Sequence, residues 1–267
     1  MTVVVIVLRL HAPPMVLEEW KRPHYQEKGG DPFLFYVVYG PVQRDVSLSP
    51  SYRSRGLPKG VNVAHYGNDR HASVISGFRE GFIWNQLVHD APELAAQIAS
   101  ATECILLRGN LPDSPDLNYL RDVIGVLTHF LDHGGICVFD PQMYHWWKPG
   151  DWRERIFAPA GSVPRHHVKI LFSEEPDNAS TWFRTTGMRK FGRPDLSLHG
   201  VTPALKIAVT DLFHRFIELM AFGAVIPEGQ SLRVAALPTG MTCHHEGTVD
   251  DPLFNNTHLE IRWPGQT

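Results

Sequence analysis

The chain has 267 residues, of which 43% are hydrophobic and 20% charged, a composition typical of a globular protein with a substantial core and not of a disordered one. Its net charge of -3 provides no field that would draw the whole molecule to nucleic acid or to an anionic membrane, so we expect neither as a partner. The three cysteines, an odd number, and first residues that do not resemble an export signal predict a cytoplasmic protein.

The N-terminal third is rich in strands and turns. Val3–Leu10 and Phe33–Tyr39 are continuous β-branched and aromatic runs, which predicts two buried strands. Residues 40–60 combine serine, proline, glycine and basic residues without a period, which indicates a long loop. Val61–Tyr66 is typical of another short strand, and a helix is expected within Ser73–His89.

The middle of the chain predicts a strand, a helix and a second strand, after a short helix over Ala91–Ala101. The strands are Cys104–Arg108 and Ile136–Asp140. Between them Ser114 is a favourable N-cap, and one apolar helical stripe follows, formed by Leu117, Leu120, Ile124, Leu127 and Leu131. This β–α–β unit, residues 104–140, should have a right-handed crossover.

A second β–α–β unit is predicted over residues 195–237. Asp195–Val201 is its first strand, residues 203–223 form its helix, and Leu232–Leu237 is its second strand. His258–Trp263 is expected to be the last strand of the chain.

Together these elements predict an α+β fold. We expect a single domain over residues 1–267, with a mixed sheet built from the two β–α–β units and the strand-rich N-terminal segment. If Phe33–Tyr39 lies at an edge of that sheet, its unpaired backbone groups favour a homodimer; a central position removes that argument.

The segment Trp182–His199 is the first candidate site, because basic side chains alternate there with glycine and proline. Three arginines can each present a rigid donor fork to a carboxylate or phosphate: Arg184, Arg189 and Arg193. Asp195 can orient an arginine, and His199 can transfer a proton near neutral pH. Strand alternation places Asp195 and His199 on one face. The alternative is a solvated basic hairpin in which Arg193 pairs with Asp195.

An aromatic segment precedes the basic one. Trp146 and Trp147, within the run DPQMYHWW, can form the wall of a ligand pocket or stack on a cation. They can equally pack a loop onto the core, since large aromatic side chains are mostly buried. Both interpretations stay open at the level of the sequence.

The C-terminal segment contains side chains of types that bind metals. Cys243, His244 and His245 are consecutive, but their spacing matches no usual metal site. We therefore predict no metal and keep His244 and His245 only as weak candidates. Asn256 is expected to face the same cleft as the basic segment.

Common signatures of nucleotide-dependent enzymes and hydrolases are missing from the sequence. The chain contains no GxGxxG after a strand, no GxxxxGK[ST], no GxSxG and no HExxH. Their absence disfavours those enzyme classes, and no cofactor is indicated.

Three motifs resemble an uncharacterised bacterial family known only as a domain of unknown function: DPQMYHWW, WFRTTGMRKFGRPDLSLH and FNNTHLEI. The resemblance extends from about Ala91 to Trp263. It implies a bacterial origin and one shared site for the basic, aromatic and asparagine-rich segments, but no activity. The family pattern leads us to expect histidine where Arg184 stands, which weakens any mechanism that needs a base there.

Our leading hypothesis is a binding protein that holds an anionic small molecule or an acidic partner surface. Arg189, Arg193 and His199 would make the contacts, beside Trp146 and Trp147. One alternative is a hydrolase-type or metal-dependent enzyme that uses His199 or the pair His244 and His245. Another is a protein-interaction module of the immunity type, which neutralises a toxin and needs no small ligand.

Overall fold

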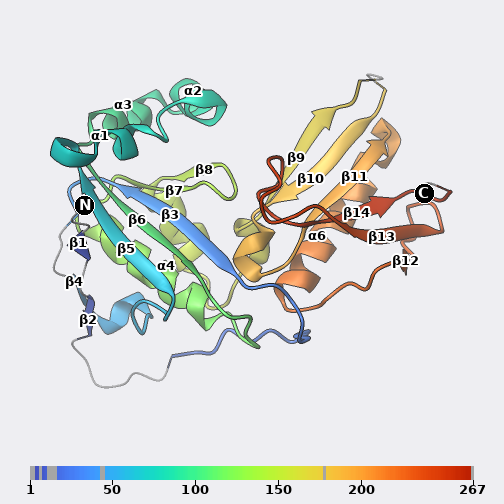
Figure 1. The fold of residues 1–267 in the computed structure, drawn as a ribbon, viewed down its shortest axis with the longest axis horizontal. Coiled ribbons are helices and arrows are strands. Elements are labelled where there is room, and N and C mark those ends of the chain that lie inside the picture. The colour runs from blue at the N-terminus through green and yellow to red at the C-terminus, as the bar shows by residue number, and fades with distance from the viewer. Residues whose placement is uncertain (1–3, 6–7, 11–16, 43–45, 177–178, 266–267) are drawn as a thin grey trace. The chain divides into compact units, whose positions relative to one another are not determined.

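The computed structural model describes residues 4–5, 8–10, 17–42, 46–176 and 179–265 (Figure 1). Sheets and helices occur throughout this part of the chain, which confirms the α+β class. The chain divides into two compact units: unit 1 is Met1–Trp20, Phe33–Leu111 and Asp116–Ser162, and unit 2 is Lys21–Pro32, Pro112–Pro115 and Val163–Thr267. The single domain expected over residues 1–267 stays a prediction, and each unit contains one of the two expected β–α–β segments.

Unit 1 is built on a six-stranded sheet of order β1-β5-β6-β3-β7-β8. Its strands are β1 (Val4–Val5), β5 (Val61–Gly67), β6 (Glu103–Asn110), β3 (Phe33–Tyr39), β7 (Cys137–Asp140) and β8 (His145–Trp147). A separate parallel pair joins β2 (Leu8–Leu10) to β4 (Val46–Leu48). The N-terminal strand expected over Val3–Leu10 therefore corresponds to two short strands, with Val3 and residues 6–7 outside the described residues.

The long loop expected over residues 40–60 is interrupted by regular structure. β4 and the 3-10 turn η1 (Pro50–Tyr52) both fall inside it, while residues 43–45 lie outside the described part of the chain. Leu48 and Ser54 are buried, so the segment packs onto unit 1. The prediction of one long loop over residues 40–60 is therefore wrong.

β3 is a central strand. It pairs antiparallel with β6 from Phe33↔Asn110 to Tyr39↔Cys104, and with β7 through Tyr39↔Cys137. β6 and β7 are therefore parallel to each other with β3 between them, and α4 (Asn118–Asp132) connects them. This is the first β–α–β unit, and the argument for a homodimer through an exposed Phe33–Tyr39 edge is withdrawn.

Helices cover both faces of the unit 1 sheet (Figure 1). One face packs against α1 (Asn68–Ser76), α2 (Gly81–Asp90) and α3 (Pro92–Ser100), through a core that contains Val37, Tyr39, Leu106 and Phe139. The other face packs against α4, whose residues are buried from Tyr119 to Leu131. After β8 come α5 (Pro149–Trp152) and the π-helical turn η2 (Arg153–Phe157).

α4 differs from its prediction in two respects. It begins at Asn118 and not at the expected cap Ser114, whose carbonyl accepts a hydrogen bond from Arg22. Its polar side is also buried, because residues 50–56 pack against it: the Ser54 hydroxyl donates to the Asp122 carbonyl, and Tyr52 contacts His129.

Unit 2 is built on a mixed six-stranded sheet of order β12-β13-β14-β11-β10-β9. Its strands are β12 (Gln230–Leu232), β13 (Met241–Glu246), β14 (His258–Arg262), β11 (Asp195–Val201), β10 (Thr181–Thr186) and β9 (Lys169–Glu174). β11 and β14 are parallel, and the other neighbours are antiparallel. Helix α6 (Lys206–Ala221) follows β11, and three 3-10 turns complete the unit: η3 (Pro164–His166), η4 (Met188–Phe191) and η5 (Pro203–Leu205).

The second β–α–β unit is β11, α6 and β12, with different bounds from those expected. The strand after the helix is Gln230–Leu232, and residues 233–237 turn away, so the strand expected over Leu232–Leu237 is wrong. Met241–Glu246, for which no strand was predicted, is a strand in which Met241 and Cys243 alternate into the core.

α6 packs against one face of this sheet and forms the core of unit 2 (Figure 1). The helix contributes Val209, Leu212, Phe213 and Phe216, and the sheet contributes Phe183, Leu196, Leu198, Leu259 and Ile261. Because strand side chains alternate, the intervening residues point to the opposite face of the sheet, among them Trp182, Arg184, Ser197, His199 and His258.

Candidate functional site

The basic segment Trp182–His199 folds as β10, the turn η4 and β11. Gly187 and Gly192 flank η4 with φ of 114° and 63°, in the left-handed region that glycine adopts without strain. A Cβ on Gly192 would lie 1.9 Å from the carbonyl oxygen of Gly30. The Gly30 N–H donates to the Gly192 carbonyl at 3.0 Å. Glycine is therefore required at Gly192 for the turn to approach this backbone.

Arg193 is an interior residue, 3% exposed. Its Nε donates to the Ala224 carbonyl (3.1 Å), Nη2 to the Gly223 carbonyl (2.9 Å) and Nη1 to the Gly192 carbonyl (2.8 Å). Nη1 also forms an ion pair with Oδ2 of Asp113 at 3.1 Å. These contacts use its donors within unit 2, so we leave Arg193 out of the site proposed below.

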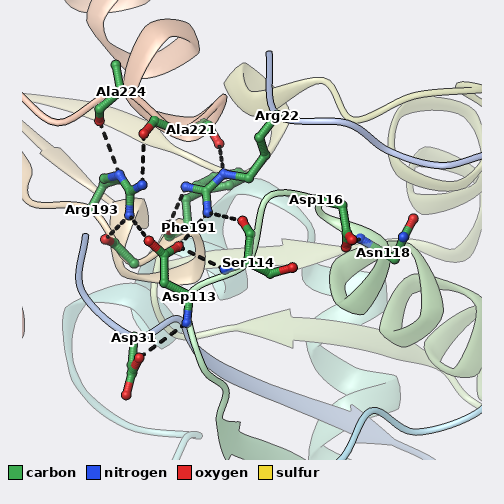
Figure 2. A network of polar contacts seen from close by, with 12 residues as sticks. Arg22, Asp31, Asp113, Ser114, Asp116, Asn118, Phe191, Arg193, Ala221 and Ala224 are labelled. Carbon is green, nitrogen blue, oxygen red and sulfur yellow. Dashed lines mark hydrogen bonds and ion pairs between the residues drawn. The ribbon is translucent and has the colours of Figure 1, made fainter. Parts of the chain in front are cut away.

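Arg22 binds the second carboxylate oxygen of Asp113. Its Nη1 lies 2.6 Å from Oδ1, while Nε donates to the Ala221 carbonyl and Nη2 to the Phe191 carbonyl. Figure 2 shows the guanidinium groups of Arg22 and Arg193 converging on Asp113. We call these three residues the arginine clamp.

The arginine clamp lies at the C-terminal end of α6. Three of the carbonyls that it binds belong to Ala221, Gly223 and Ala224, which end or follow this helix. Carbonyls at a helix C-terminus have no partners within the helix and carry partial negative charge. Two guanidinium groups neutralise that charge, and Asp113 compensates the two cations. The clamp explains the buried position of Arg193 without any ligand.

Asp195 and Asn256 are also interior residues. Asp195 accepts hydrogen bonds from the Thr185 hydroxyl (2.8 Å), the Met188 N–H (3.2 Å) and Asn256 Nδ2 (2.9 Å). Burial raises the pKa of Asp195 to about 6, although these hydrogen bonds and the charge of Lys190 act in the opposite direction. Asp195 is 1% exposed and Asn256 5%, so both join the turn to the strands and neither faces a ligand.

Arg189 lies at the surface and holds the segment that precedes β14. Its Nη1 donates to the Asn255 carbonyl at 2.9 Å and to the Asn255 side chain at 3.3 Å. Asn255 has a φ of 52°, a conformation that asparagine adopts more readily than most residues. Arg189 thus stabilises a tight turn.

Trp182 is the centre of a stack on the sheet face opposite α6. The Arg184 guanidinium carbon lies 4.3 Å from the centre of the indole ring, and the His199 ring stacks on the indole at 4.8 Å. The indole N–H donates to the Ser197 hydroxyl at 2.9 Å. Arg184 Nε is buried and has no hydrogen-bond partner among the described residues.

His199 is held in place by Glu175. Its Nδ1 lies 2.8 Å from Oε1 of Glu175, which also accepts the Gly200 N–H, while Oε2 accepts the Ser180 hydroxyl. Burial acts to raise the pKa of Glu175, but these hydrogen bonds outweigh it and the pKa lies below its ordinary value. The His199 side chain is 54% exposed, so its ring remains accessible to solvent.

Two further aromatic residues complete this surface. The Phe254 ring contacts Trp182 edge to face at 6.0 Å and stacks on His258 at 4.1 Å. The Nδ1 atom of His258 is a second buried polar atom that finds no hydrogen-bond partner in the described part of the chain. We call Trp182, Arg184, His199, Phe254 and His258 the Trp182 face.

Trp146 and Trp147 belong to unit 1 and pack within it. Trp146 stacks on Phe139 at 4.0 Å, and Trp147 meets Trp152 edge to face at 6.2 Å. They are 8% and 2% exposed. The packing interpretation describes both residues, and neither is used in the site below.

His244 and His245 make contacts that use their ring nitrogens. The two nitrogens of His244 lie 2.7 Å from Glu228 Oε1 and 2.9 Å from the Thr242 hydroxyl, and Nε2 of His245 lies 2.7 Å from the Ile226 carbonyl. Within the residues that the structure describes, no three His, Cys, Asp or Glu side chains gather in a way that could hold a metal ion.

Comparison with known proteins gives no relative: no family model matches the chain, and neither a curated protein nor a solved structure does. The family resemblance of the three motifs therefore stays a prediction. Of the helices in the described ranges, none has the length and apolar character needed to cross a membrane.

Sequence reasoning missed three functional or organising residues: Arg22, Asp113 and Glu175. Arg22 and Asp113 are 91 residues apart in the chain, and Asp113 and Arg193 are 80 apart, so no local pattern links them. Glu175 lies 24 residues before His199 and meets it through the β9–β10–β11 pairing. An antiparallel hairpin predicted before β11 would have been the only signal for this pair.

Proposed function

We propose that unit 2 binds a small anionic molecule, carrying a phosphate or carboxylate group, on the Trp182 face. The proposal rests on the contacts of the Arg184 guanidinium group. Its guanidinium rests on the Trp182 indole while its buried Nε has no hydrogen-bond partner among the described residues. A buried donor without a partner is costly, and an anionic oxygen would supply the missing acceptor.

The other basic residues of the segment differ from Arg184 because they bind carbonyls or carboxylates of the protein itself. Arg193 donates to three backbone carbonyls and to Asp113, and the Lys190 ammonium, fully buried, donates to the His167 carbonyl at 2.8 Å. Arg189 is engaged with Asn255. The buried Nε of Arg184 has no such partner among the described residues, which favours Arg184 as the ligand contact.

The two histidines of the Trp182 face can also donate hydrogen bonds to an anion. His199 is exposed and His258 carries a buried Nδ1 without a partner in the described chain. A neutral imidazole offers one donor and a protonated one offers two, so either ring can contribute to an anion beside Arg184. A small anion is favoured over a flat aromatic ligand because Arg184, His199 and Phe254 already contact the indole.

The test uses inorganic phosphate and citrate as probes. Either is titrated into nitrogen-15-labelled protein, and the indole N–H signal of Trp182, assigned by its loss in Trp182→Phe, is followed. Arg184→Gln removes the charge, and Arg165→Gln is the matched control, since Arg165 is a surface arginine of the same unit. We expect saturable shifts in wild type and Arg165→Gln, and affinity weakened roughly ten-fold or more in Arg184→Gln. Equal binding by the two variants, or equal shifts with sodium chloride, would overturn the proposal.

A second candidate function is proton transfer at His199. It is favoured by the hydrogen bond that fixes Nδ1 on Glu175, because a base oriented by a carboxylate is the usual arrangement in acid–base catalysis. Hydrolysis of p-nitrophenyl acetate tests it with His199→Asn and Glu175→Gln. Saturable turnover that both variants lose is expected, and a wild-type rate equal to that of His199→Asn rejects this candidate.

A further inference from the structure

β9 ends the unit 2 sheet, and it pairs with β10 alone among the described residues. Its sequence is KILFSE, and Phe172 at its middle is 57% exposed. Phe172 lies opposite Phe183 in the register, and the two rings contact edge to face at 4.6 Å. The apolar face that α6 covers therefore continues to an open edge, and such an edge readily accepts another strand.

We propose that this edge pairs with β9 of a second copy of the chain, antiparallel and about a two-fold axis perpendicular to the sheet. Such an axis reverses the strand direction and keeps each side chain on its own face of the extended sheet. Directly opposite residues must then both be odd-numbered or both even-numbered. The proposal concerns the β9 edge. This edge shares Glu175, which holds His199, with the Trp182 face, but the pairing does not depend on what that face binds.

The register is decided by charge. With the axis at Phe172, the two Phe172 rings meet on the face that α6 covers, and Lys169 lies opposite Glu175 of the second copy. The alternative with the axis at Leu171 places Lys169 opposite Ser173, which offers no charge. Lys169 is half-buried, and Glu175 of the second copy would supply an ion pair for its ammonium group.

The pairing also accounts for Phe172. In one copy this ring contacts Phe183, and the residue is still 57% exposed. Across the axis it would contact its own counterpart, and two-fold aromatic pairs of this kind stabilise antiparallel strands. Glu174, which is exposed, would lie beside Ile170 of the second copy at the rim of the contact.

Oxidative cross-linking tests the register in the full chain. Phe172→Cys places two thiols directly across the axis, whereas Leu171→Cys places them two positions out of register. The three native cysteines are buried and free, so they serve as an internal background. We expect a disulfide-linked dimer for Phe172→Cys and none for Leu171→Cys. Cross-linking of Leu171→Cys alone, or of neither variant, would overturn the proposal.

The molecular mass of the protein in solution is an independent test of the dimer. Wild type should elute by size exclusion with light scattering at twice the chain mass of 30.1 kDa. Phe172→Glu should dissociate the dimer, weakening it by roughly 100-fold or more, because it brings two carboxylates together at the axis. Phe82→Glu, at a phenylalanine of α2 that is 77% exposed, is the control and should leave the dimer intact. A wild type that is monomeric at its highest soluble concentration contradicts the pairing.

Discussion

The indole of Trp182 and the imidazole of His199 lie face to face, with ring centres 4.8 Å apart and planes 9° from parallel. Trp182 is on β10 and His199 on β11, and the strand pairing shifts register between Thr181 and Phe183, next to Trp182. The pairs Phe183↔Leu198 and Arg184↔Ser197, continued by one residue, place Trp182 directly opposite His199 on the same face of the sheet. The stack therefore follows from the regular register, and it fixes the only histidine of the segment against a rigid ring.

Asp113 holds two buried guanidinium groups, so its loss should destabilise unit 2 strongly. Asp113→Asn keeps the shape but leaves Arg22 and Arg193 without a counter-ion, and we expect a loss of about 3–5 kcal/mol in the free energy of unfolding. Urea denaturation measures it. The control is Glu218→Gln, which breaks the exposed pair with Arg165 and should cost about 1 kcal/mol or less. Similar losses in both variants would contradict the role of the arginine clamp.

Asp195 makes the protein less stable as the pH rises. Its pKa is about 6 in the folded protein against an ordinary 3.8, so the folded state binds the proton more tightly than the unfolded one. Between about pH 4 and pH 6 this group should remove up to about 3 kcal/mol of stability. Asp195→Asn cannot ionise, and relative to wild type it should gain stability across that window. Parallel pH profiles of the two proteins in urea denaturation would refute this assignment.

His129, in unit 1, should make the protein less stable as the pH falls. Burial, with the charge of the neighbouring His133, lowers its pKa to about 4, and its ring stacks on His133 at 4.0 Å. The unfolded chain therefore takes up the proton first, and stability should fall by up to about 3 kcal/mol as the pH drops from 6.5 toward 4. His129→Phe cannot be protonated and should not show this acid-side loss. Thermal unfolding at pH 7 and pH 4.5 distinguishes the two proteins.

Gly192 cannot be replaced without moving the backbone. A Cβ there meets the Gly30 carbonyl oxygen at 1.9 Å, and φ is positive, so Gly192→Ala should cost roughly 3 kcal/mol or more. Gly229 has a similar φ of 69° but nothing within 4 Å of an added Cβ. Gly229→Ala should therefore cost only about 1–2 kcal/mol. Equal losses of unfolding free energy would show that φ alone, and not the contact with Gly30, sets the requirement.

Continuous apolar runs and helical stripes predicted the elements that have many buried positions. The stripes of α4 and α6 and the strands β3, β6 and β11 were all predicted, although α4 begins four residues after its expected cap. β13 was missed because His244, His245 and Glu246 obscure an alternation of only two buried residues, Met241 and Cys243. A short strand with only two alternating buried positions cannot be distinguished from a loop by its sequence pattern.

The candidate site was harder to predict than the fold. Arg193 and Asp195 were expected either to serve a ligand or to pair in a solvated hairpin, yet both are buried. Arg193 donates to backbone carbonyls and to Asp113, and Asp195 accepts from the Thr185 hydroxyl. Such burial depends on partners far away in the chain, chiefly Asp113, which no local pattern identifies. The structure places His199 and Arg184 against the Trp182 ring, a contact that the sequence did not predict, and their role in binding stays a prediction.

The path of the chain through unit 2 has a consequence for biosynthesis. Arg22 and Asp113 lie in short stretches that leave the ribosome well before Arg193 and the end of α6. Until residues 163–224 emerge, the carboxylate of Asp113 has neither Arg193 nor the helix end to bind, so unit 2 cannot be completed during most of translation. A chain halted before residue 193 would expose an unfinished unit 2, which makes this protein sensitive to any truncation of its C-terminal half.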